Sequence, residues 1–187
     1  RHSAGLLATI NNTLDAASLE AGRYRVDIEP LDMLDVVNAV EQTVRPLAEE
    51  KGVRFSVELD AGFPLVLTDP SIVHKVLMNL LSNAVKFTGT AGTVILAIKL
   101  EREAGQPMLY IRVADTGIGI PEEELATIFE RFRQADSSIS RRYGGSGLGL
   151  ALVKEMAELL DGTASVESEV GSGSTFTVHI PCEVMED

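Results

Sequence analysis

The strand-like segments of this chain come in adjacent pairs, and this pairing constrains the fold more than any other feature. Apolar and polar residues alternate over residues 94–100 and 109–113, and again over residues 165–169 and 174–180. A short connection containing Gly joins the two members of each pair, which predicts two antiparallel hairpins. Helical patterns lie between the hairpins. The sequence therefore predicts an α+β fold, with a mixed, mostly antiparallel sheet covered by helices on one face.

Three internal segments carry apolar residues at helical spacing. They cover residues 34–51, 71–87 and 148–160. In the first two of them, apolar residues recur on one helix face, which is expected to be buried. These faces consist of Leu34, Val37, Val40, Val44 and Leu47 in the first helix, and of Val73, Val76, Leu77, Leu80, Leu81 and Ala84 in the second.

The boundaries of these elements have chemical signals of their own. Asp69 is a suitable cap for the second helix, and Pro70 occupies the first helical position that proline favours. Pro46 lies inside the first helix, so we expect a kink or a shifted boundary there. Shorter elements are expected as extended segments over residues 27–32, 53–59 and 65–67, and as a short helix within residues 121–129.

The N-terminal residues 1–21 are expected to form a helix that ends at Gly22. One face of this helix is apolar at the 3-4-3 spacing of a two-heptad stripe. That spacing fits a partner helix in a coiled coil or bundle, and it fits packing on the following domain nearly as well. The stripe consists of Leu7, Ile10, Leu14 and Ala17.

The composition excludes several classes of protein. The chain has 16 Lys plus Arg against 28 Asp plus Glu, a net charge of −12, which repels nucleic acid and anionic membranes. No segment approaches the roughly 18 consecutive apolar residues of a membrane span. The lone Cys182 has no partner for an internal disulfide. We therefore expect a cytoplasmic domain without membrane contact, and its first residue, Arg1, suggests a piece of a longer protein.

A polar stripe runs along the helix predicted over residues 71–87. Lys75, Asn79, Asn83 and Lys86 fall within about 80° of arc on this helix. The stripe is either a solvated face or a polar wall. In a wall of this kind, an amide oxygen can coordinate a hard cation and a lysine can contact phosphate.

Two glycine-rich segments suggest close backbone approach to a ligand. Asp115-Thr-Gly117-Ile-Gly119-Ile directly follows a predicted strand, so a carboxylate at the strand end could accept a hydrogen bond from an exocyclic amine. Residues 144–150, Gly-Gly-Ser-Gly-Leu-Gly-Leu, open the helix over residues 148–160 and offer free N–H groups to an anion. Taken singly, each segment also fits an ordinary turn.

The standard nucleotide-binding loops do not fit these glycines. No Lys follows a Gly, which excludes a Walker A loop, and no Gly triplet has the Rossmann spacing. The chain also lacks the His-Arg-Asp and Asp-Phe-Gly motifs of eukaryotic-type protein kinases.

The order of these motifs resembles that of sensor histidine kinases of two-component systems, within the GHKL ATPase superfamily. Asn79-Leu-Leu-Ser-Asn83-Ala-Val-Lys86-Phe-Thr resembles the N box, and residues 115–120 resemble the G1 box. Phe129-Glu-Arg-Phe132 is similar to the F box, and residues 145–150 to the G2 box. The resemblance extends to residues 1–22, which are similar to the end of the second dimerisation helix.

The resemblance implies a two-layer α/β sandwich of the Bergerat type over residues 23–187, with ATP held beneath a lid of about residues 116–147. By this resemblance, Asn83 binds Mg²⁺, Lys86 contacts phosphate and Asp115 binds the adenine amine. Thr175 resembles a threonine that helps to hold adenine. The implied nucleotide-binding residues are Asn79, Asn83, Lys86, Phe87, Asp115, Gly117, Gly119, Ile120, Phe132, Gly145, Gly147, Leu148, Gly149 and Thr175.

The resemblance also implies kinase chemistry, with Asn79, Lys86 and Arg133 as the catalytic candidates. Hydrolysing members of the superfamily have a Glu at the position of Asn79, and an amide cannot accept a proton at neutral pH. This favours transfer of the γ-phosphoryl group over hydrolysis. Two alternatives stay open, which are a regulatory module without kinase activity and, less favoured, an ATP-driven clamp.

The phosphoacceptor histidine is expected outside this chain. None of His2, His74 and His179 is followed by the pattern of the family's H box. The implied partners are therefore a histidine on a dimerisation domain, a response regulator receiver domain and a second copy of the full-length protein.

The lid departs from the family at one position. Some members have an arginine for the γ-phosphate where this chain has Gln134. Arg133, Arg141 or Arg142 could take that role, because a guanidinium at the γ-phosphate stabilises the transferring group. The Arg141-Arg142 pair fits a solvated loop equally well.

Overall fold

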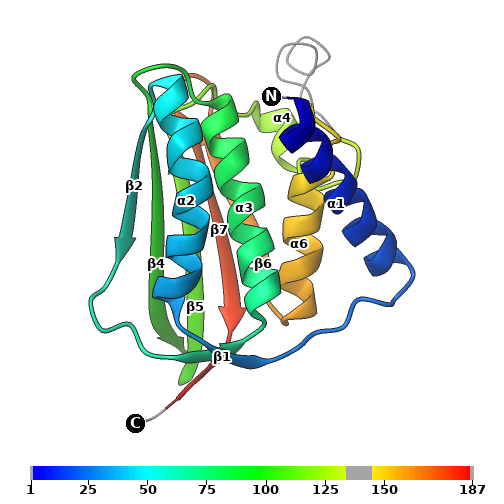
Figure 1. The fold of residues 1–187 in the computed structure, drawn as a ribbon, viewed down its shortest axis with the longest axis vertical. Helices are drawn as coiled ribbons and strands as arrows, with labels where there is room; N and C mark the ends of the chain where they lie inside the picture. The colour runs from blue at the N-terminus through cyan, green and yellow to red at the C-terminus, as the bar shows by residue number, and fades with distance from the viewer. Residues whose placement is uncertain (1, 134–144, 186–187) are drawn as a thin grey trace.

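The structure is a computed structural model that describes residues 2–133 and 145–185, with side chains from residue 5 onward. It has two layers, a sheet and a layer of helices packed on one face of it (Figure 1). This arrangement confirms the predicted α+β sandwich. The helices that cover the sheet are α2 (Met33–Lys51), α3 (Pro70–Phe87) and α6 (Gly149–Leu159).

The main sheet has five strands in the order β2-β4-β5-β7-β6. The strands are β2 (Arg54–Leu59), β4 (Thr93–Glu103), β5 (Gln106–Asp115), β6 (Thr163–Glu169) and β7 (Gly173–Pro181). The pairs β4–β5 and β6–β7 are the predicted hairpins, and β5 pairs with β7 in the same antiparallel sense. Among the described strands of this sheet, only β2 and β4 pair in parallel. Helix α3 lies between them in the sequence and returns the chain to the end of the sheet where β2 began.

The helix boundaries follow the caps expected from the sequence. The Asp69 Oδ1 atom accepts a hydrogen bond from Ile72 N at 3.0 Å, and Pro70 is the first residue of α3. Asp32 caps α2 in the same way, and Gly52 ends that helix in a left-handed conformation. The expectation of a boundary at Pro46 is wrong, since α2 continues to Lys51.

The core lies between the covering helices and the sheet. The buried face of α3 contains every residue predicted for it, together with Ile72 and Val85. The face predicted for α2 is partly wrong, because Leu34 and Leu47 are 53% and 46% exposed. The buried residues of α2 are Met33, Val36, Val37, Val40, Val44 and Ala48.

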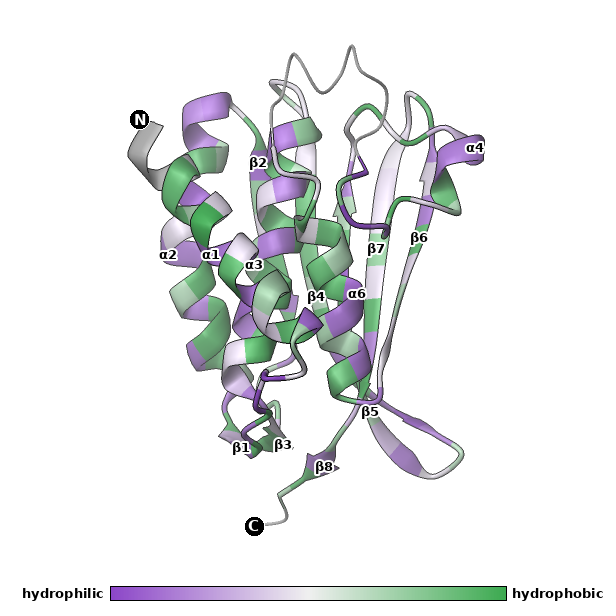
Figure 2. Cartoon of the chain, turned by 90° about the vertical axis from the view of Figure 1, so that its right-hand side faces the viewer, coloured by the Kyte–Doolittle hydropathy of each residue, from purple (hydrophilic) through white to green (hydrophobic). Residues whose placement is uncertain are grey.

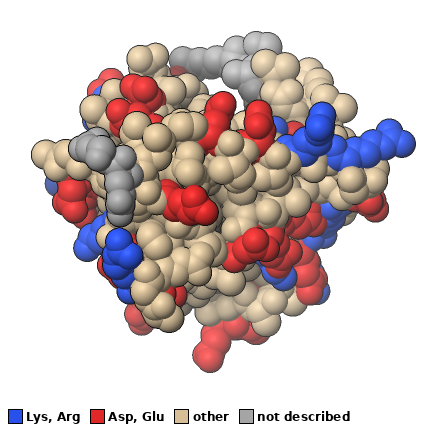
Figure 3. Space-filling view, turned by 90° about the horizontal axis from the view of Figure 1, so that it is seen from below, with Lys and Arg blue, Asp and Glu red and all other residues tan. Residues whose placement is uncertain are grey.

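A second, three-stranded sheet closes the lower end of the molecule. It consists of β1 (Glu29–Leu31), β3 (Val66–Thr68) and β8 (Glu183–Val184), all antiparallel. The predicted extended segments at residues 27–32 and 65–67 correspond to β1 and β3. Acidic side chains are frequent on this face when it is seen from below (Figure 3).

The N-terminal helix α1 (His2–Glu20) lies beside α6 at the edge of the helical layer (Figure 1). Figure 2 views the molecule from this side. The predicted apolar stripe does not pack on the domain, because Leu7, Ile10 and Leu14 are 60%, 46% and 61% exposed. The helix instead packs through a neighbouring face that contains the buried Ala16 and the partly buried Leu19. Within the described part of the chain, no helix has the length and apolar character needed to cross a membrane.

Candidate functional site

Asp115 lies at the end of β5, where the sheet meets the first glycine-rich loop. Its Oδ1 atom accepts a hydrogen bond from Gly117 N at 2.8 Å. Burial raises the pKa of the Asp115 carboxyl, and the backbone N–H groups of Gly117 and Ser174 oppose this rise. A partly buried carboxylate at a strand end can accept a hydrogen bond from a ligand as well.

The loop after Asp115 is fixed by backbone contacts to both of its neighbours. Ile118 N donates to Phe87 O at 3.2 Å, and Gly171 N donates to Ile118 O at 2.9 Å. Ile120 N donates to the Ser168 hydroxyl at 2.8 Å. The first residues of the predicted lid, 116–120, are therefore anchored to the end of α3 and to the β6–β7 turn.

Two glycines of this loop fit where no side chain could. A Cβ atom on Gly117 would lie 2.4 Å from Phe87 O, and one on Gly119 would lie 2.1 Å from Glu169 O. Contacts this short with backbone atoms leave no room to adjust. The backbone can therefore approach its neighbours, and a flat ligand beside it, only because both residues are glycine.

Thr175 is not brought to Asp115. The β5–β7 register pairs Asp115 with Ser174 and Ala114 with Thr175, and successive residues of a strand point to opposite faces. The buried Ser174 therefore occupies the position beside Asp115, and its hydroxyl lies 2.7 Å from the Ser168 hydroxyl. Neither Ser168 nor Ser174 was predicted from the sequence. The register of β7 against β5 decides whether Ser174 or Thr175 lies beside Asp115, and a shift of one residue exchanges the faces of a strand.

The second glycine-rich loop lies against the polar stripe of α3. A Cβ atom on Gly145 would be 2.8 Å from Lys86 Nζ. A Cβ atom on Gly149 would be 3.1 Å from Asn79 Oδ1 and 3.9 Å from Asn83 Nδ2. The sequence-distant N box and G2 box are thus brought together, as the predicted polar wall requires.

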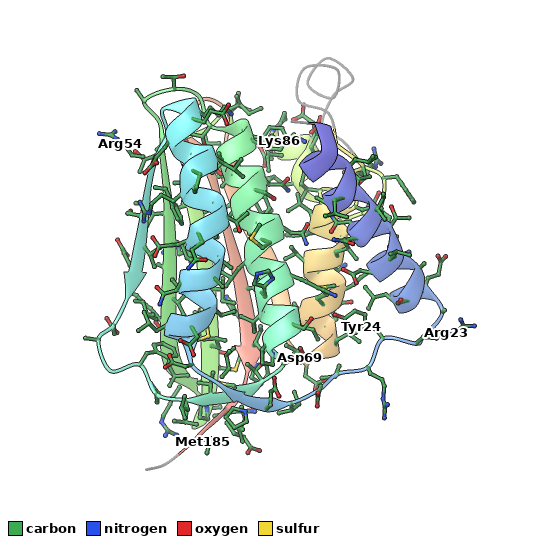
Figure 4. The ribbon with its side chains drawn as sticks, viewed as in Figure 1. Arg23, Tyr24, Arg54, Asp69, Lys86 and Met185 are labelled. Carbon is green, nitrogen blue, oxygen red and sulfur yellow. The ribbon has the colours of Figure 1, made fainter. Side chains whose placement is uncertain are left out.

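Lys86 occupies the upper end of α3, and Asp69 lies at the opposite end of this helix (Figure 4). The Lys86 Nζ atom lies 5.2 Å from the centre of the Phe87 ring. Burial lowers the pKa of Lys86, because the charged form is less well solvated there. An ammonium group in this position is well placed to attract an anion.

The other half of the stripe faces helix α1. Lys75 Nζ donates to Asp15 Oδ1 at 2.9 Å and to the Tyr24 hydroxyl at 3.0 Å. Burial acts to lower the pKa of Lys75, but these two partners outweigh it and the net shift is upward. Asn79 Oδ1 accepts a hydrogen bond from Asn12 Nδ2 at 3.2 Å. The stripe therefore contacts both α1 and the glycine loop, and the interpretation as a purely solvated face is wrong.

The F box packs against β7 and lies alongside Gly147. The Phe129 ring makes an edge-to-face contact with Phe176, with centroids 6.1 Å apart. Phe132 N donates to Gly147 O at 2.9 Å, while the Phe132 side chain is 72% exposed. Arg133 is also exposed and pairs with Glu130 at 3.1 Å.

Arg131 connects the end of the F box with helices α1 and α6, and no sequence motif predicted this contact. Its guanidinium donates two hydrogen bonds to the Glu155 carboxylate of α6, at 2.8 and 2.9 Å. It also lies 3.6 Å from a carboxylate oxygen of Glu20 and 3.5 Å from Ala16 O, both on α1. The end of the F box is thus tied to both helices.

Several predicted residues do not lie in the described site. Gln134, Arg141 and Arg142 fall outside the described residues. His74 is partly buried on α3, and His179 packs against Tyr110 with ring centroids 4.4 Å apart. Phe87 and Leu148 flank the site at the end of α3 and the start of α6, where Leu148 is buried.

Comparison with known proteins identifies the family. Residues 68–184 match the family model described as "Histidine kinase-, DNA gyrase B-, and HSP90-like ATPase". The chain is 44% identical over 181 residues to the autoinducer 2 sensor kinase/phosphatase LuxQ of Vibrio vulnificus, covering 95% of this chain and 21% of LuxQ. It is 42% identical over 184 residues to the circadian input-output histidine kinase CikA of Synechococcus elongatus, covering 96% of this chain and 24% of CikA.

Solved structures agree with these relatives. Full-length ShkA, solved in complex with AMPPNP, superposes with a TM-score of 0.83 at 31% identity, over 97% of this chain and 37% of ShkA. The mycobacterial sensor histidine kinase MprB superposes with a TM-score of 0.69 at 25% identity, over 85% of this chain and all of the MprB chain. The chain therefore belongs to the family of histidine kinase-, DNA gyrase B- and HSP90-like ATPases, and within it to the catalytic domains of sensor histidine kinases.

The chain spans only about a fifth to a quarter of the length of the curated relatives LuxQ and CikA. What those proteins do as a whole depends on parts that this chain does not contain.

Proposed function

We propose that this domain binds Mg²⁺-ATP and transfers the γ-phosphoryl group to a histidine on a dimerisation domain, in two-component signalling. The observation that carries the proposal is the meeting of two distant segments. Lys86 and Asn83 of α3 face Gly145 and Gly149 of the second loop, and Asp115 lies across the end of the same helix.

The residues of this site fit ATP. The Asp115 carboxylate can accept a hydrogen bond from the exocyclic amine of adenine, and Gly117 and Gly119 let the loop beside it pack closely on the backbone of Phe87 and Glu169. Lys86 supplies positive charge for the phosphates, and Gly145 places a backbone N–H without a side chain beside it. Phosphoryl transfer needs mainly such positioning and charge neutralisation.

The residues also fit a magnesium ion that is bound largely through the nucleotide. Mg²⁺ usually keeps several waters and takes one or two protein ligands together with phosphate oxygens. The amide oxygen of Asn83 provides one such ligand. Among residues 2–133 and 145–185, no group of three or more His, Cys, Asp or Glu could hold the ion without the nucleotide.

Asn79 supports transfer over hydrolysis. Its amide accepts a hydrogen bond from Asn12 of α1 and donates one to Lys75 O at 3.0 Å. The Asn79 side chain is thus held by α1 and by the backbone of its own helix. An amide cannot remove a proton from water at neutral pH. The γ-phosphoryl group therefore requires another nucleophile, and we assign that role to a histidine outside this chain.

The exposed stripe of α1 supports a second copy as partner. Leu7, Ile10 and Leu14 face away from the domain, although burying them in a helix–helix contact would be favourable. We propose that residues 1–22 are the end of a dimerisation helix, that residues 23–187 are the catalytic domain, and that the phosphoryl group passes on to a response regulator.

Calorimetric titration with AMPPNP, with and without Mg²⁺, tests the proposed site. We expect Mg²⁺-dependent binding that Asn83→Ala weakens and Asp115→Ala abolishes. The exposed Asn38 of α2 supplies a matched control, because Asn38→Ala removes the same amide far from the site. Labelled ATP should then transfer phosphate to a supplied dimerisation domain with its histidine. Nucleotide binding without transfer would favour the regulatory module instead.

A further inference from the structure

Lys51 is a lysine outside all four motifs that contacts the end of the N-box helix. It is the last residue of α2, directly before the left-handed cap at Gly52. Its Nζ atom donates hydrogen bonds to Val85 O at 2.8 Å and to Lys86 O at 2.5 Å. Both acceptors belong to the last turn of α3.

These contacts satisfy carbonyl groups that a helix cannot satisfy internally. The last four carbonyls of an α-helix lack N–H partners within the helix, and the helix dipole places partial negative charge there. An ammonium group is the complementary cap. Partial burial in this contact lowers the pKa of Lys51, because the charged form is less well solvated there.

The backbone around Lys51 fixes the same region from a second side. The Thr90 hydroxyl donates to Lys51 O at 3.1 Å, and Ala91 N donates to Gly52 O at 2.8 Å. The loop that leaves α3 is therefore tied to the end of α2. The end of α3 is therefore held in two ways. The Lys51 ammonium binds its last carbonyl groups, and these hydrogen bonds hold the loop that follows it.

The residues at this terminus serve both parts of the nucleotide site. Lys86 extends its ammonium toward Gly145, and the carbonyl of Phe87 accepts the hydrogen bond of Ile118 beside Gly117. A change in the last turn of α3 would move both contacts, because they start from adjacent residues.

The geometry points to Lys51 as a positioning residue for nucleotide binding, which acts by holding the last turn of α3 so that Lys86 meets the phosphates. This inference rests on the proposed function, since it concerns the same site. Lys51 itself touches backbone carbonyls and needs no contact with the nucleotide.

A double-mutant cycle on AMPPNP binding tests this role. Lys51→Met keeps the length of the side chain and removes its charge and donors, and we expect affinity to fall about tenfold. Lys86→Met should lower the AMPPNP affinity further. If Lys51 acts through Lys86, the double variant binds about as weakly as Lys86→Met alone, whereas independent effects would multiply.

Two further variants separate positioning from stability. Lys51→Arg keeps the charge and the donors and should restore most of the affinity, and Lys154→Met removes an exposed lysine of α6 as the matched control. Urea unfolding of each variant identifies the conditions under which all of them are folded. If Lys51→Met does not fold, Lys51→Gln, which keeps an amide donor, replaces it in the same cycle.

The outcomes are distinct. Affinity that falls with Lys51→Met, returns with Lys51→Arg and is non-additive with Lys86→Met supports the inference. A folded Lys51→Met variant with the affinity of the wild type overturns the inference. Fully multiplicative effects of Lys51→Met and Lys86→Met also overturn it. Both results leave the proposed function intact. A wild-type chain that does not bind AMPPNP overturns the proposed function, and this inference with it.

Discussion

The two ends of the candidate nucleotide site are built in different ways. At the Asp115 end, Ile118 and Gly171 are joined by backbone hydrogen bonds, and glycines pack against backbone carbonyls. At the Gly145 end, the nearest group is the flexible ammonium tip of Lys86. One end is defined by groups that cannot move independently, and the other by a side chain with several rotatable bonds.

This difference matches what each end would bind in the proposed function. A purine ring is flat and rigid, so a preformed slot binds it with little loss of conformational entropy. A triphosphate with its metal ion is charged and changes during the reaction, so it needs donors that can follow it. The contrast predicts that a Cβ added to a glycine that packs on backbone at the Asp115 end harms folding, while one added at the Gly145 end harms mainly binding.

The largest effect is expected for Gly119→Ala. The added Cβ would lie 2.1 Å from Glu169 O, and the φ angle of Gly119 is +72°. Because the obstacle is backbone, we expect a loss of about 3 kcal/mol or more in the free energy of unfolding. Urea unfolding measures this loss.

Gly171→Ala provides the matched control for Gly119→Ala. Gly171 has a similar φ of +84°, but a Cβ there would meet nothing within 4 Å. It should cost only the strain of the left-handed conformation, about 1 kcal/mol. Equal losses in the two variants would show that the backbone slot is not rigid.

The second effect is expected for Asp115→Ala in nucleotide affinity. Removing the charged acceptor leaves the adenine amine without a partner, and hydrogen bonds to charged groups contribute about 1.5–3 kcal/mol. We therefore expect at least a tenfold loss of AMPPNP affinity. Calorimetry measures it, and a wild-type domain that binds GTP as tightly as AMPPNP would indicate that Asp115 does not select the base.

The third effect is expected for Gly145→Ala, at the other end. Its Cβ would be 2.8 Å from Lys86 Nζ, and a flexible side chain can move away from it. We expect a change of about 1 kcal/mol in the free energy of unfolding, and a severalfold loss of AMPPNP affinity because Lys86 is displaced. If Gly145→Ala unfolds as readily as Gly119→Ala, the contrast between the two ends is false.

The sequence predicted best those elements whose signals are local. Helix α3 has a cap, a proline at its first position and a clear period, and every residue predicted for its buried face is buried, while Ile72 and Val85 were missed. The N, G1 and G2 boxes lie on segments that meet in the structure. A helix cap, a proline at the first helical position and a helical period depend only on residues that are close together in the sequence.

The errors concern interactions between distant segments. Helix α1 has apolar residues at several positions around its axis, and the polar contacts of Asn12 and Asp15 with α3 decide which face packs. The choice between Ser174 and Thr175 depends on the register against β5. Arg131 meets Glu155 and Glu20 only after folding, so no local pattern could reveal that contact.

The smallest effect is a pH dependence that again separates the two ends. Burial raises the pKa of Asp115, so the folded, nucleotide-free domain holds this proton more tightly than the unfolded chain does. Ionised Asp115 is needed to accept the adenine amine, so AMPPNP affinity should fall on acidification at a pH above that expected for an ordinary aspartate, about 3.9.

Stability should respond to pH in the opposite direction. A raised pKa in the folded state means that Asp115 lowers the free energy of unfolding as pH rises from about 3.9 through the folded-state pKa. Asp115→Asn cannot ionise, so above that window it should stabilise the nucleotide-free domain while weakening AMPPNP binding. Urea unfolding and calorimetry at a series of pH values measure both. An Asp115→Asn variant that is less stable than the wild type at neutral pH would mean that the Gly117 and Ser174 N–H groups, and not burial, dominate at this end.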